Sequence, residues 1–537
     1  MVLERKTQMS QSKPDRTLDE KVKSIFQEWK LTIVVFCVVF LVAFLVRIIN
    51  LTILPVFADE AIYIRWAQIM ANEPTLRFLP LSDGKQPLFM WIVMVLVGIA
   101  DDPLVIGRMV SVAAGLVSLG GVFVLSYLLF RSKCVSLVSS LLWAISPFSV
   151  FFDRMALVDG LVASLAVWIV IFAVLTVKYA RLDMAMITGF LLGLAFLTKS
   201  PALFFLLLIP SALLFAKLPE GREKRLVHSI KLGLYVVVIW VIGFGMQNIL
   251  RLGPNYHLIA QRNVDYVYPI SHIISSSLDP FLPHFHRHLE WLWMMGPGFV
   301  LVFIFVGGVG NLKKNWREVL LLVLWSVGLV SASAMYAKVF TARYIFYTIP
   351  FYFILAASSF GLKKIRKYLY VVLFLFVVNA VWFDYLLLTN PEKAYLPRSE
   401  RSGYLEEWTA GTGIAWVADY IKEEARNNPD RHIVVGTEGF FGTLPDGLQM
   451  YLEGVRNVTV IGVGLAIKDV HSSLVESYNS GNSTYLVVNS SRLDNVTPEQ
   501  MGLEIVYSVK KAIRDTEFSR EKALNGPQDT FYFLKVI

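Results

Sequence analysis

Four groups of charged residues lie beside long apolar stretches of this sequence, and their types could act on a phosphate ester. Lysine and arginine can hold a phosphate and ease its departure, and a carboxylate can activate the attacking group. The four groups are Asp59 and Glu60 in FADEAIYIRWAQIM, Lys85 in SDGKQPLFMW, Asp153, Arg154 and Asp159 in FFDRMALVDGLVA, and Lys199 in LAFLTKSPALF with Arg343 and Tyr344 in FTARYIFYTIP.

Each of these charges taken singly has a simpler interpretation, since a charged side chain at a membrane surface can extend to water. Charge next to a bilayer is nevertheless costly and is usually kept for function. We therefore expect carboxylates from two segments and cations from three others to meet on one face of the protein.

The composition indicates a membrane protein. Hydrophobic residues make up 55% of the 537 residues and charged residues only 17%, and so much apolar surface must face lipid. The net charge of +9 comes from short basic clusters between apolar runs, which is typical of cytoplasmic loops rather than of a nucleic-acid-binding surface. Cys37 and Cys134 both lie in apolar runs, which argues against a disulfide framework or a thiolate metal site.

Apolar runs of about 20 residues can cross the hydrocarbon core. The N-terminus is polar and charged for roughly thirty residues before the first run, so we interpret that run as a retained signal anchor. The sequence predicts about eleven transmembrane helices, near 31–54, 107–130, 134–152, 159–179, 184–199, 201–217, 229–250, 289–311, 318–338, 342–361 and 368–389.

The positive-inside rule orients these helices and decides the ambiguous run at 87–100. If 87–100 does not cross, the basic clusters all fall on the side of the basic N-terminus; if it crosses, they all fall outside. We therefore predict a juxtamembrane or re-entrant helix at 87–100 and a cytoplasmic N-terminus. The clusters are those at 131–133, 178–181, 217–225, 311–317 and 362–367.

The chain changes character near residue 390, where it becomes polar and alternates helical and strand-like stretches. This alternation predicts a small α/β domain with a largely parallel sheet. The predicted organisation is a basic cytoplasmic tail at 1–30, a membrane all-α catalytic domain at 31–389 and an extracytoplasmic α/β domain at 390–537. Outer loops are predicted at 55–106, 153–158 and 251–288.

The order of DEAIY, KQP, R-x-A-L-V-D, LAFLTKSP and ARY resembles the GT-C superfamily of polytopic glycosyltransferases. Within it, the sequence is most similar to the dolichyl-phosphate-mannose protein mannosyltransferases and the lipid A aminoarabinose transferases. The resemblance covers roughly residues 30–360 and is strongest at 57–205. It implies a first outer loop that carries an acidic motif and juxtamembrane helices.

The resemblance also implies roles for individual residues. Asp59 matches the catalytic carboxylate, with Glu60 beside it, and Lys85 matches the lysine that holds the carrier phosphate. Asp159 matches the second acidic motif, next to Asp153 and Arg154. Arg343 matches a basic residue near the phosphate in relatives, and we expect Lys199 and Tyr344 to bind the carrier phosphate as well.

No cofactor is certain from the sequence, and a divalent metal is left open. Some relatives place a glutamate before the lysine, where this sequence has Gly84. The spacing H-x-H-x-H at His284, His286 and His288 could offer imidazoles to a metal, together with Asp59, although alternate residues of a loop need not converge.

The predicted function is transfer of a sugar from a polyprenyl- or dolichyl-phosphate donor to a hydroxyl of a protein, lipid or glycan on the outer face. Asp59 would act as general base, aided by Glu60, and the anomeric configuration would invert. Asp159 would orient the surroundings of Asp59, the acceptor or an optional metal. Two alternatives stay open: transfer of a lipid-linked oligosaccharide, and a polytopic transporter or flippase of lipid-linked sugars. The predicted partners are the lipid donor, the acceptor and the bilayer, with no nucleic acid.

Overall fold

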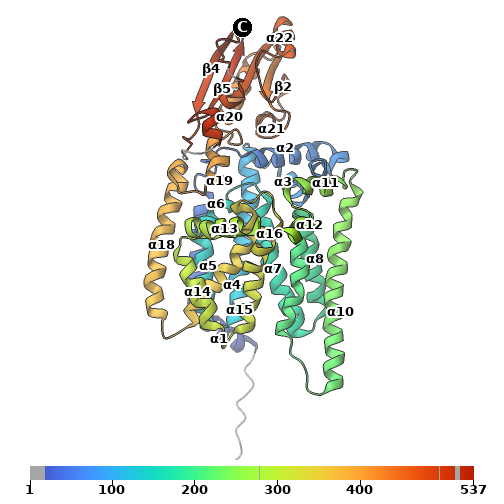
Figure 1. Cartoon of the computed structure of the whole chain (residues 1–537), viewed down its shortest axis with the longest axis vertical. Coiled ribbons are helices and arrows are strands. Elements are labelled where there is room, and N and C mark those ends of the chain that lie inside the picture. Colours follow the sequence, from blue (N-terminus) through green and yellow to red (C-terminus); the bar gives the residue numbers. More distant parts are fainter. Residues whose placement is uncertain (1–17, 277, 495, 515–519) are drawn as a thin grey trace, which may run out of the picture.

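The computed structural model describes residues 18–276, 278–494, 496–514 and 520–537. It consists of a long helical bundle with a small α/β domain at one end (Figure 1). The first helix begins at Leu18, inside the predicted tail at 1–30, whose residues 1–17 lie outside the described part of the chain.

The bundle contains α-helices that run back and forth along its length (Figure 1). They are α1 (Leu18–Ile48), α4 (Pro103–Phe130), α5 (Lys133–Ile145), α6 (Pro147–Asp153), α7 (Val158–Tyr179), α8 (Leu182–Thr198), α9 (Ala202–Leu208), α10 (Arg222–Gln247), α14 (Phe299–Asn311), α15 (Trp316–Val323), α16 (Leu329–Tyr336), α17 (Ile349–Ser358) and α18 (Arg366–Thr389).

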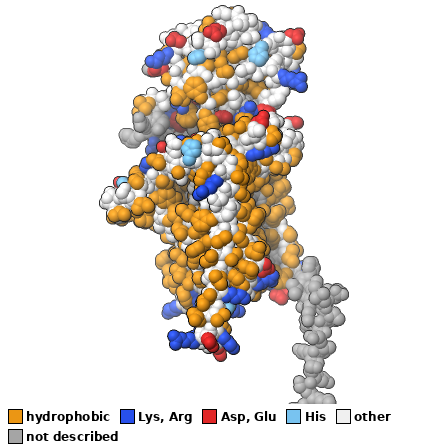
Figure 2. All heavy atoms as spheres, turned by 90° about the vertical axis from the view of Figure 1, so that its right-hand side faces the viewer, with side chains coloured by type: hydrophobic (Ala, Val, Ile, Leu, Met, Phe, Trp, Pro, Cys, Tyr) orange, Lys and Arg blue, Asp and Glu red, His pale blue; other side chains and the backbone are white. Residues whose placement is uncertain are grey.

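Within the described residues, seven helices are long and apolar enough to cross a membrane, or nine if each of two bent pairs counts as one span. Two shorter apolar helices cover Leu182–Thr198 and Ala202–Phe215. All eleven predicted segments are therefore helical, and the chain is a multi-pass membrane protein. On the face shown in Figure 2, hydrophobic side chains cover most of the bundle, and most charged side chains lie towards its two ends.

The predicted span at 289–311 is wrong in its first part. Residues 289–295 belong to α13 (Phe281–Met295), which makes an angle of 113° with α14 and lies across the bundle (Figure 1). The break falls at Gly296, Pro297 and Gly298, because proline cannot continue a helix and glycine favours its termination. A milder bend of 57° separates α5 from α6 at Pro147.

Short helices lie at the end of the bundle next to the α/β domain (Figure 1). The length of α3, nine residues or roughly 13 Å at 1.5 Å per residue, agrees with the prediction that 87–100 does not cross. The short helices are α2 (Ala58–Asn72), α3 (Leu88–Leu96), α11 (Leu258–Tyr266), α12 (Ile270–Ser275) and α19 (Arg398–Arg401), together with the 3-10 helix η6 (Ala342–Thr348).

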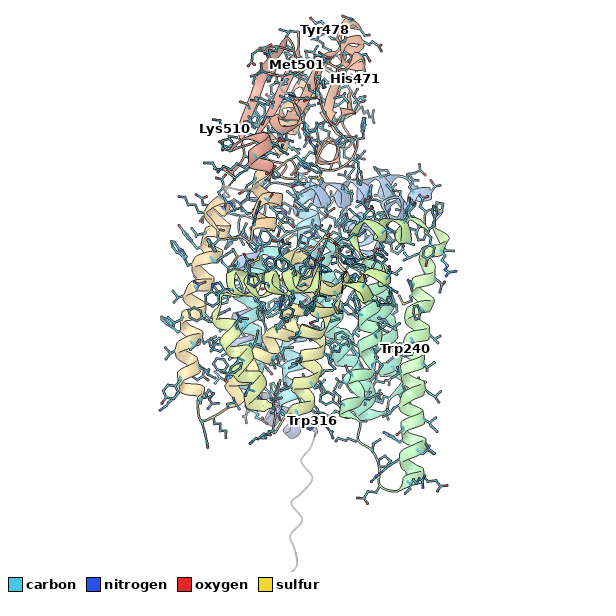
Figure 3. All side chains as sticks on the ribbon, viewed as in Figure 1. Trp240, Trp316, His471, Tyr478, Met501 and Lys510 are labelled. Atoms are coloured by element: carbon cyan, nitrogen blue, oxygen red, sulfur yellow. The ribbon has the colours of Figure 1, made fainter. Side chains whose placement is uncertain are left out.

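The bundle ends opposite the α/β domain are joined by the basic turns of the sequence. Figure 1 shows one end of each of α10, α14, α15 and α18 here, and Trp316, the first residue of α15, is labelled at this end in Figure 3. The clusters at 217–225, 311–317 and 362–367 thus share one end of the molecule.

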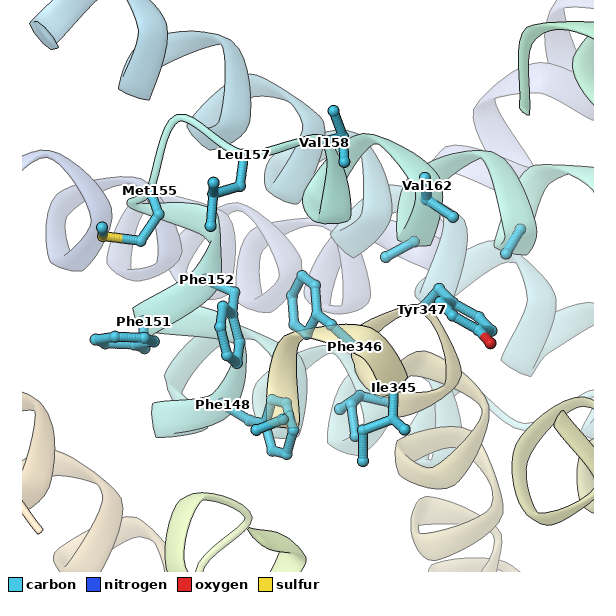
Figure 4. Packing of buried hydrophobic residues seen from close by; sticks show 14 of the residues in the cluster. Phe148, Phe151, Phe152, Met155, Leu157, Val158, Val162, Ile345, Phe346 and Tyr347 are labelled. Carbon is cyan, nitrogen blue, oxygen red and sulfur yellow. The ribbon is translucent and has the colours of Figure 1, made fainter. Parts of the chain in front are cut away.

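A cluster of buried rings fixes η6 within the bundle. Phe346 of η6 stacks on Phe148 of α6 at 6.0 Å with the rings 5° from parallel, and on Trp143 of α5 at 5.4 Å. Figure 4 shows Phe346 packed among Phe148 and Phe152. All are at most 1% exposed, so the burial of aromatic area holds the segment that carries Arg343.

The C-terminal domain contains a five-stranded sheet in the order β2-β1-β3-β5-β4, counted over the described residues. Its three predicted strands are confirmed and pair in parallel, whereas β4 and β5 form an antiparallel pair that the sequence did not lead us to predict. The elements are β1 (Ile433–Glu438), β2 (Val458–Gly464), β3 (Ser483–Asn489), β4 (Leu503–Lys510) and β5 (Thr530–Val536), with α20 (Ile414–Asn427), α21 (Asp446–Tyr451), α22 (Ser472–Asn479) and α23 (Arg520–Asn525).

Candidate active site

A cavity opens where the bundle meets the short helices, at the end that carries the α/β domain. It is lined by residues from the first turn of α2, the turn before α3, the start of α7, the end of α8, α11 and η6. The predicted residues that line it are Asp59, Lys85, Asp159, Lys199, Arg343 and Tyr344.

Asp59 lines this cavity and lies between two cations. The Lys85 Nζ donates to Oδ1 at 2.9 Å, and Nη1 of Arg343 donates to Oδ2 at 2.6 Å. Burial alone would raise the pKa of the Asp59 carboxyl. The positive charges of Lys85 and Arg343 lower this pKa by more than burial raises it, so it lies well below its usual range. Asp59 is therefore a carboxylate at neutral pH.

Helix α2 positions Asp59 in its first turn, where a negative charge is favourable. The backbone before it is tied to the chain that follows the bundle: Phe57 pairs with Ala410 in an antiparallel bridge, and the Ala58 N–H donates to the Thr409 carbonyl at 3.1 Å. The site is thus built partly by residues near the C-terminal domain.

Lys85 follows a turn that is packed closely by α11. Its Nζ lies 3.3 Å from Asp83, and Asp83 lies 3.5 Å from Nε of Arg262 on α11. Burial would lower the pKa of Lys85, but the Asp59 carboxylate raises it more, so the ammonium stays charged. The result is a row of alternating charges that joins three segments.

Gly84 has no room for a side chain. Its φ is +65°, and a Cβ built there would lie 2.6 Å from the Arg262 Cβ and 2.8 Å from the Leu258 carbonyl oxygen. A glutamate before Lys85, as in some relatives, would push α11 away from the site. This close approach explains the glycine physically.

Replacing Gly84 by alanine is therefore expected to displace α11 and to lower transfer activity by about tenfold, which corresponds to a loss of about 1.4 kcal/mol of transition-state stabilisation. Gly98→Ala is the matched control: Gly98 also has a positive φ (+87°), but a Cβ there meets nothing within 4 Å. Enzyme assays of both purified variants measure the difference. Equal activities of the two variants would contradict a role for the contact with α11.

A second ion pair, between Lys199 and Asp159, lines the same cavity. The Lys199 Nζ donates to Oδ1 of Asp159 at 2.5 Å and lies 4.6 Å from the centre of the Tyr344 ring. Asp159 is in the first turn of α7 and Lys199 follows the last residue of α8. The prediction that charges from distant segments gather in one place agrees with this geometry.

Glu60 does not line the cavity, which corrects its predicted catalytic role. It is fully buried, and its oxygens accept hydrogen bonds from Arg108 at 2.9 and 2.8 Å, from Phe57 N–H at 3.0 Å and from Ala156 N–H at 2.6 Å. A carboxylate satisfied in this way has no free lone pair for a substrate proton, so Glu60 fixes the start of α2 instead.

Asp153 and Arg154 also lie away from the cavity. Asp153 is fully buried and accepts a hydrogen bond from Nε of Arg47 at 2.9 Å. The Arg154 guanidinium donates to carbonyls at the end of α1, including those of Ile49 at 2.8 Å and Asn50 at 2.7 Å. It therefore caps α1, where the last carbonyls lack helical partners.

The histidine metal site is not formed. The H-x-H-x-H segment lies in α13, so that His284 and His288 are buried on one face and His286 is exposed on another. His284 Nδ1 donates to the Ala334 carbonyl at 3.2 Å. Across the described residues, no three His, Cys, Asp or Glu side chains are grouped to hold a metal, and the oxygens of Asp59 face cations.

Several residues that line the cavity were not predicted from the sequence, among them Tyr63, Gln86 and Arg262. Lys85 lies 5.0 Å from the centre of the Tyr63 ring, and Gln86 donates to Oγ of Ser200 at 2.8 Å. Arg262 and Tyr266 are four residues apart, so on a helix they share one face, and this spacing could have indicated that both line the site.

Comparisons with known proteins agree with this fold. Residues 84–244 match the family model described as dolichyl-phosphate-mannose-protein mannosyltransferase. The fold is similar to that of ArnT from Cupriavidus metallidurans, both in the apo state and bound to undecaprenyl phosphate. Both structures have a TM-score of 0.53 and 16% sequence identity to this chain. The match covers 93% of this chain and 97% of the apo chain, and 94% of this chain and 98% of the chain bound to undecaprenyl phosphate.

The fold of this chain is also similar to the fold of the archaeal oligosaccharyltransferase AglB from Archaeoglobus fulgidus, solved in complex with an inhibitory peptide and a dolichol-phosphate. That likeness has a TM-score of 0.50 and 12% identity, and covers 87% of this chain and 70% of that one. No curated protein matches the chain in sequence.

The predicted fold class and the resemblance to GT-C glycosyltransferases are thereby confirmed. The chain therefore shares with ArnT a multi-pass helical membrane domain followed by a C-terminal α/β domain, and its residues 84–244 match the mannosyltransferase family model.

Proposed function

We propose that this protein transfers a sugar from a polyprenyl- or dolichyl-phosphate donor to an acceptor hydroxyl on the non-cytoplasmic side of the membrane. The observation that carries the proposal is the position of the Asp59 carboxylate between Lys85 and Arg343. Cations on both sides of a carboxylate can hold a carrier phosphate beside the group that activates an attacking hydroxyl, which supports the proposal.

The reaction is a single displacement in which one bond forms and one bond breaks. The acceptor oxygen attacks the anomeric carbon, the bond from this carbon to the phosphate oxygen breaks, and the configuration inverts. Asp59 takes the hydroxyl proton. Lys85 and Arg343 stabilise the charge that grows on the departing phosphate, which is usually the largest single contribution to such catalysis.

The depressed pKa of Asp59 belongs to the site before the donor binds. Once a phosphate lies between them, Lys85 and Arg343 divide their hydrogen bonds between two anions, and the pKa of Asp59 rises towards its usual value. The carboxylate thus becomes a stronger base when the donor is in place. Asp159, held by Lys199, orients the acceptor side of the cavity.

The two alternatives from the sequence differ in support. The family match is to a mannosyltransferase model and no observation favours transport, so we do not propose a transporter. The fold likeness to an oligosaccharyltransferase keeps transfer of a larger glycan compatible with the same chemistry. Profiling lipid-linked sugars in cells that lack the protein tests the donor: one accumulating polyprenyl-phosphate sugar supports the proposal, and an unchanged profile contradicts it.

The proposed orientation predicts the side of each loop. A reporter fused after residue 133 is expected in the cytoplasm, because the basic turns lie at that end of the bundle, and one fused after residue 389 outside it. A fusion after residue 217 is the control for the cytoplasmic side. Protease accessibility in sealed vesicles measures the sides. Reporters after 133 and 389 on the same side would refute the orientation.

A further inference from the structure

The connector between α18 and the α/β domain, residues 390–411, contacts the backbone next to Asp59 and the backbone next to Arg343. Near one end it pairs with the backbone just before Asp59: Gly411 N–H donates to the Val56 carbonyl at 2.8 Å, and Ala58 N–H donates to the Thr409 carbonyl at 3.1 Å. Near its middle, at Glu400, it reaches the backbone just before Arg343.

Glu400 makes this second contact. Its Oε1 accepts a hydrogen bond from the Ala342 N–H at 2.9 Å, and its Oε2 accepts one from Oγ of Ser399 at 2.5 Å. Ala342 is the first residue of η6, where backbone N–H groups lack partners within the helix, and Thr341 before it provides no side-chain cap. Glu400 therefore caps η6 from a different part of the chain.

The environment of Glu400 fits a role in holding Arg343. The side chain is 2% exposed, and an ionised carboxylate is costly to bury unless it is paired. The positive charge of the Arg343 guanidinium stabilises the negative charge of Glu400. Tyr404, in the same connector, interacts electrostatically with both Arg343 and Glu400. Burial raises the pKa of Glu400 to about 6, against the effect of Ser399, Ala342 and Arg343.

We propose that Glu400 is a positioning residue, which holds Arg343 at the distance from Asp59 that the carrier phosphate requires. This inference rests on the proposed function, because it assumes that Arg343 binds the phosphate. It also gives the connector that leads into the C-terminal domain a role in the site, because this connector contacts the backbone next to both Asp59 and Arg343.

The test compares Glu400→Ala, Glu400→Gln and Glu400→Asp in the full-length protein. Alanine removes both acceptors, so we expect the KM for a polyprenyl-phosphate sugar to rise about tenfold, with a smaller fall of about threefold in kcat because Arg343 also stabilises the departing phosphate. Glutamine keeps an acceptor for Ala342 N–H and a donor for Ser399, and should restore KM to within about threefold of the wild type. Aspartate, one methylene shorter, should give an intermediate KM.

Glu392→Ala is the matched control, since Glu392 is an exposed carboxylate of the same connector; it should leave both constants unchanged. A loss of kcat with KM unchanged, or a glutamine variant as impaired as alanine, would overturn the inference. If the alanine variant does not fold, the aspartate and glutamine variants carry the comparison in the same way.

A double-variant cycle separates this inference from the proposed function. Because Glu400 acts through Arg343, Glu400→Ala should raise KM no further once Arg343→Ala is present, whereas independent effects would multiply. An unchanged KM in Arg343→Ala alone would defeat the proposed function. A raised KM in Arg343→Ala with a multiplicative effect of Glu400→Ala would defeat only the inference.

Discussion

Replacing Asp59 by asparagine is expected to lower the rate of sugar transfer by about 10²–10⁴-fold, which is the usual contribution of a positioned general base. Asparagine has nearly the same shape, but its amide cannot take the proton of the acceptor hydroxyl. Single-turnover transfer from a radiolabelled polyprenyl-phosphate sugar measures the rate without a contribution from product release.

Donor binding should survive in this variant. Lys85 and Arg343 lose the carboxylate with which they are paired and stay charged, so a phosphate meets less competition for them. Asp101→Asn is the control, because Asp101 is an exposed carboxylate in the turn before α4. Transfer by Asp59→Asn at a near-normal rate would exclude Asp59 as the base.

Replacing Lys85 or Arg343 by alanine is expected to weaken binding of the lipid-phosphate donor by about 10-fold to 100-fold. A hydrogen bond to a charged group contributes about 1.5–3 kcal/mol, and every 1.4 kcal/mol is a factor of ten in affinity. The measurement is equilibrium binding of a polyprenyl phosphate to the detergent-solubilised protein.

Arg343→Lys should recover only part of the lost affinity, because lysine keeps the charge but not the planar fork that contacts two oxygens. Lys422→Ala, on α20 in the C-terminal domain, serves as the control for loss of a positive charge. Unchanged affinity in both the Lys85 and Arg343 variants would show that the phosphate binds elsewhere.

The sequence was sufficient to predict that distant charges share one cavity. Asp59, Lys85, Asp159, Lys199 and Arg343 come from segments up to 284 residues apart and line the same space. The positive-inside rule made this possible, because it placed their helix ends on one side of the membrane before any packing was known.

Neighbouring residues could not be told apart in the same way. Asp59 and Glu60 are adjacent, but successive positions of an α-helix point about 100° apart, so that one faces the cavity and the other faces Arg108. Which of the two faces inward depends on the packing of α2 against α4, and a single sequence carries no sign of it.

Other differences between prediction and structure come from local patterns that allow two structures. The H-x-H-x-H segment is compatible with a loop, but in α13 the helical spacing separates His286 from His284 and His288. The strands β4 and β5 were not predicted because the alternation of helix and strand ends before them, although TFYFLKV has the aromatic and β-branched residues of a strand. Glu400 gave no signal, since its partner lies 58 residues away.

The most direct test of the central claim measures donor binding and transfer on the same preparations of Asp59→Asn and Lys85→Ala. We expect the asparagine variant to bind polyprenyl phosphate as well as the wild type and to transfer almost no sugar. We expect the alanine variant to bind weakly and to regain part of its transfer at high donor concentration. If both variants lose binding and transfer in the same proportion, the division between a base and phosphate-holding cations is wrong.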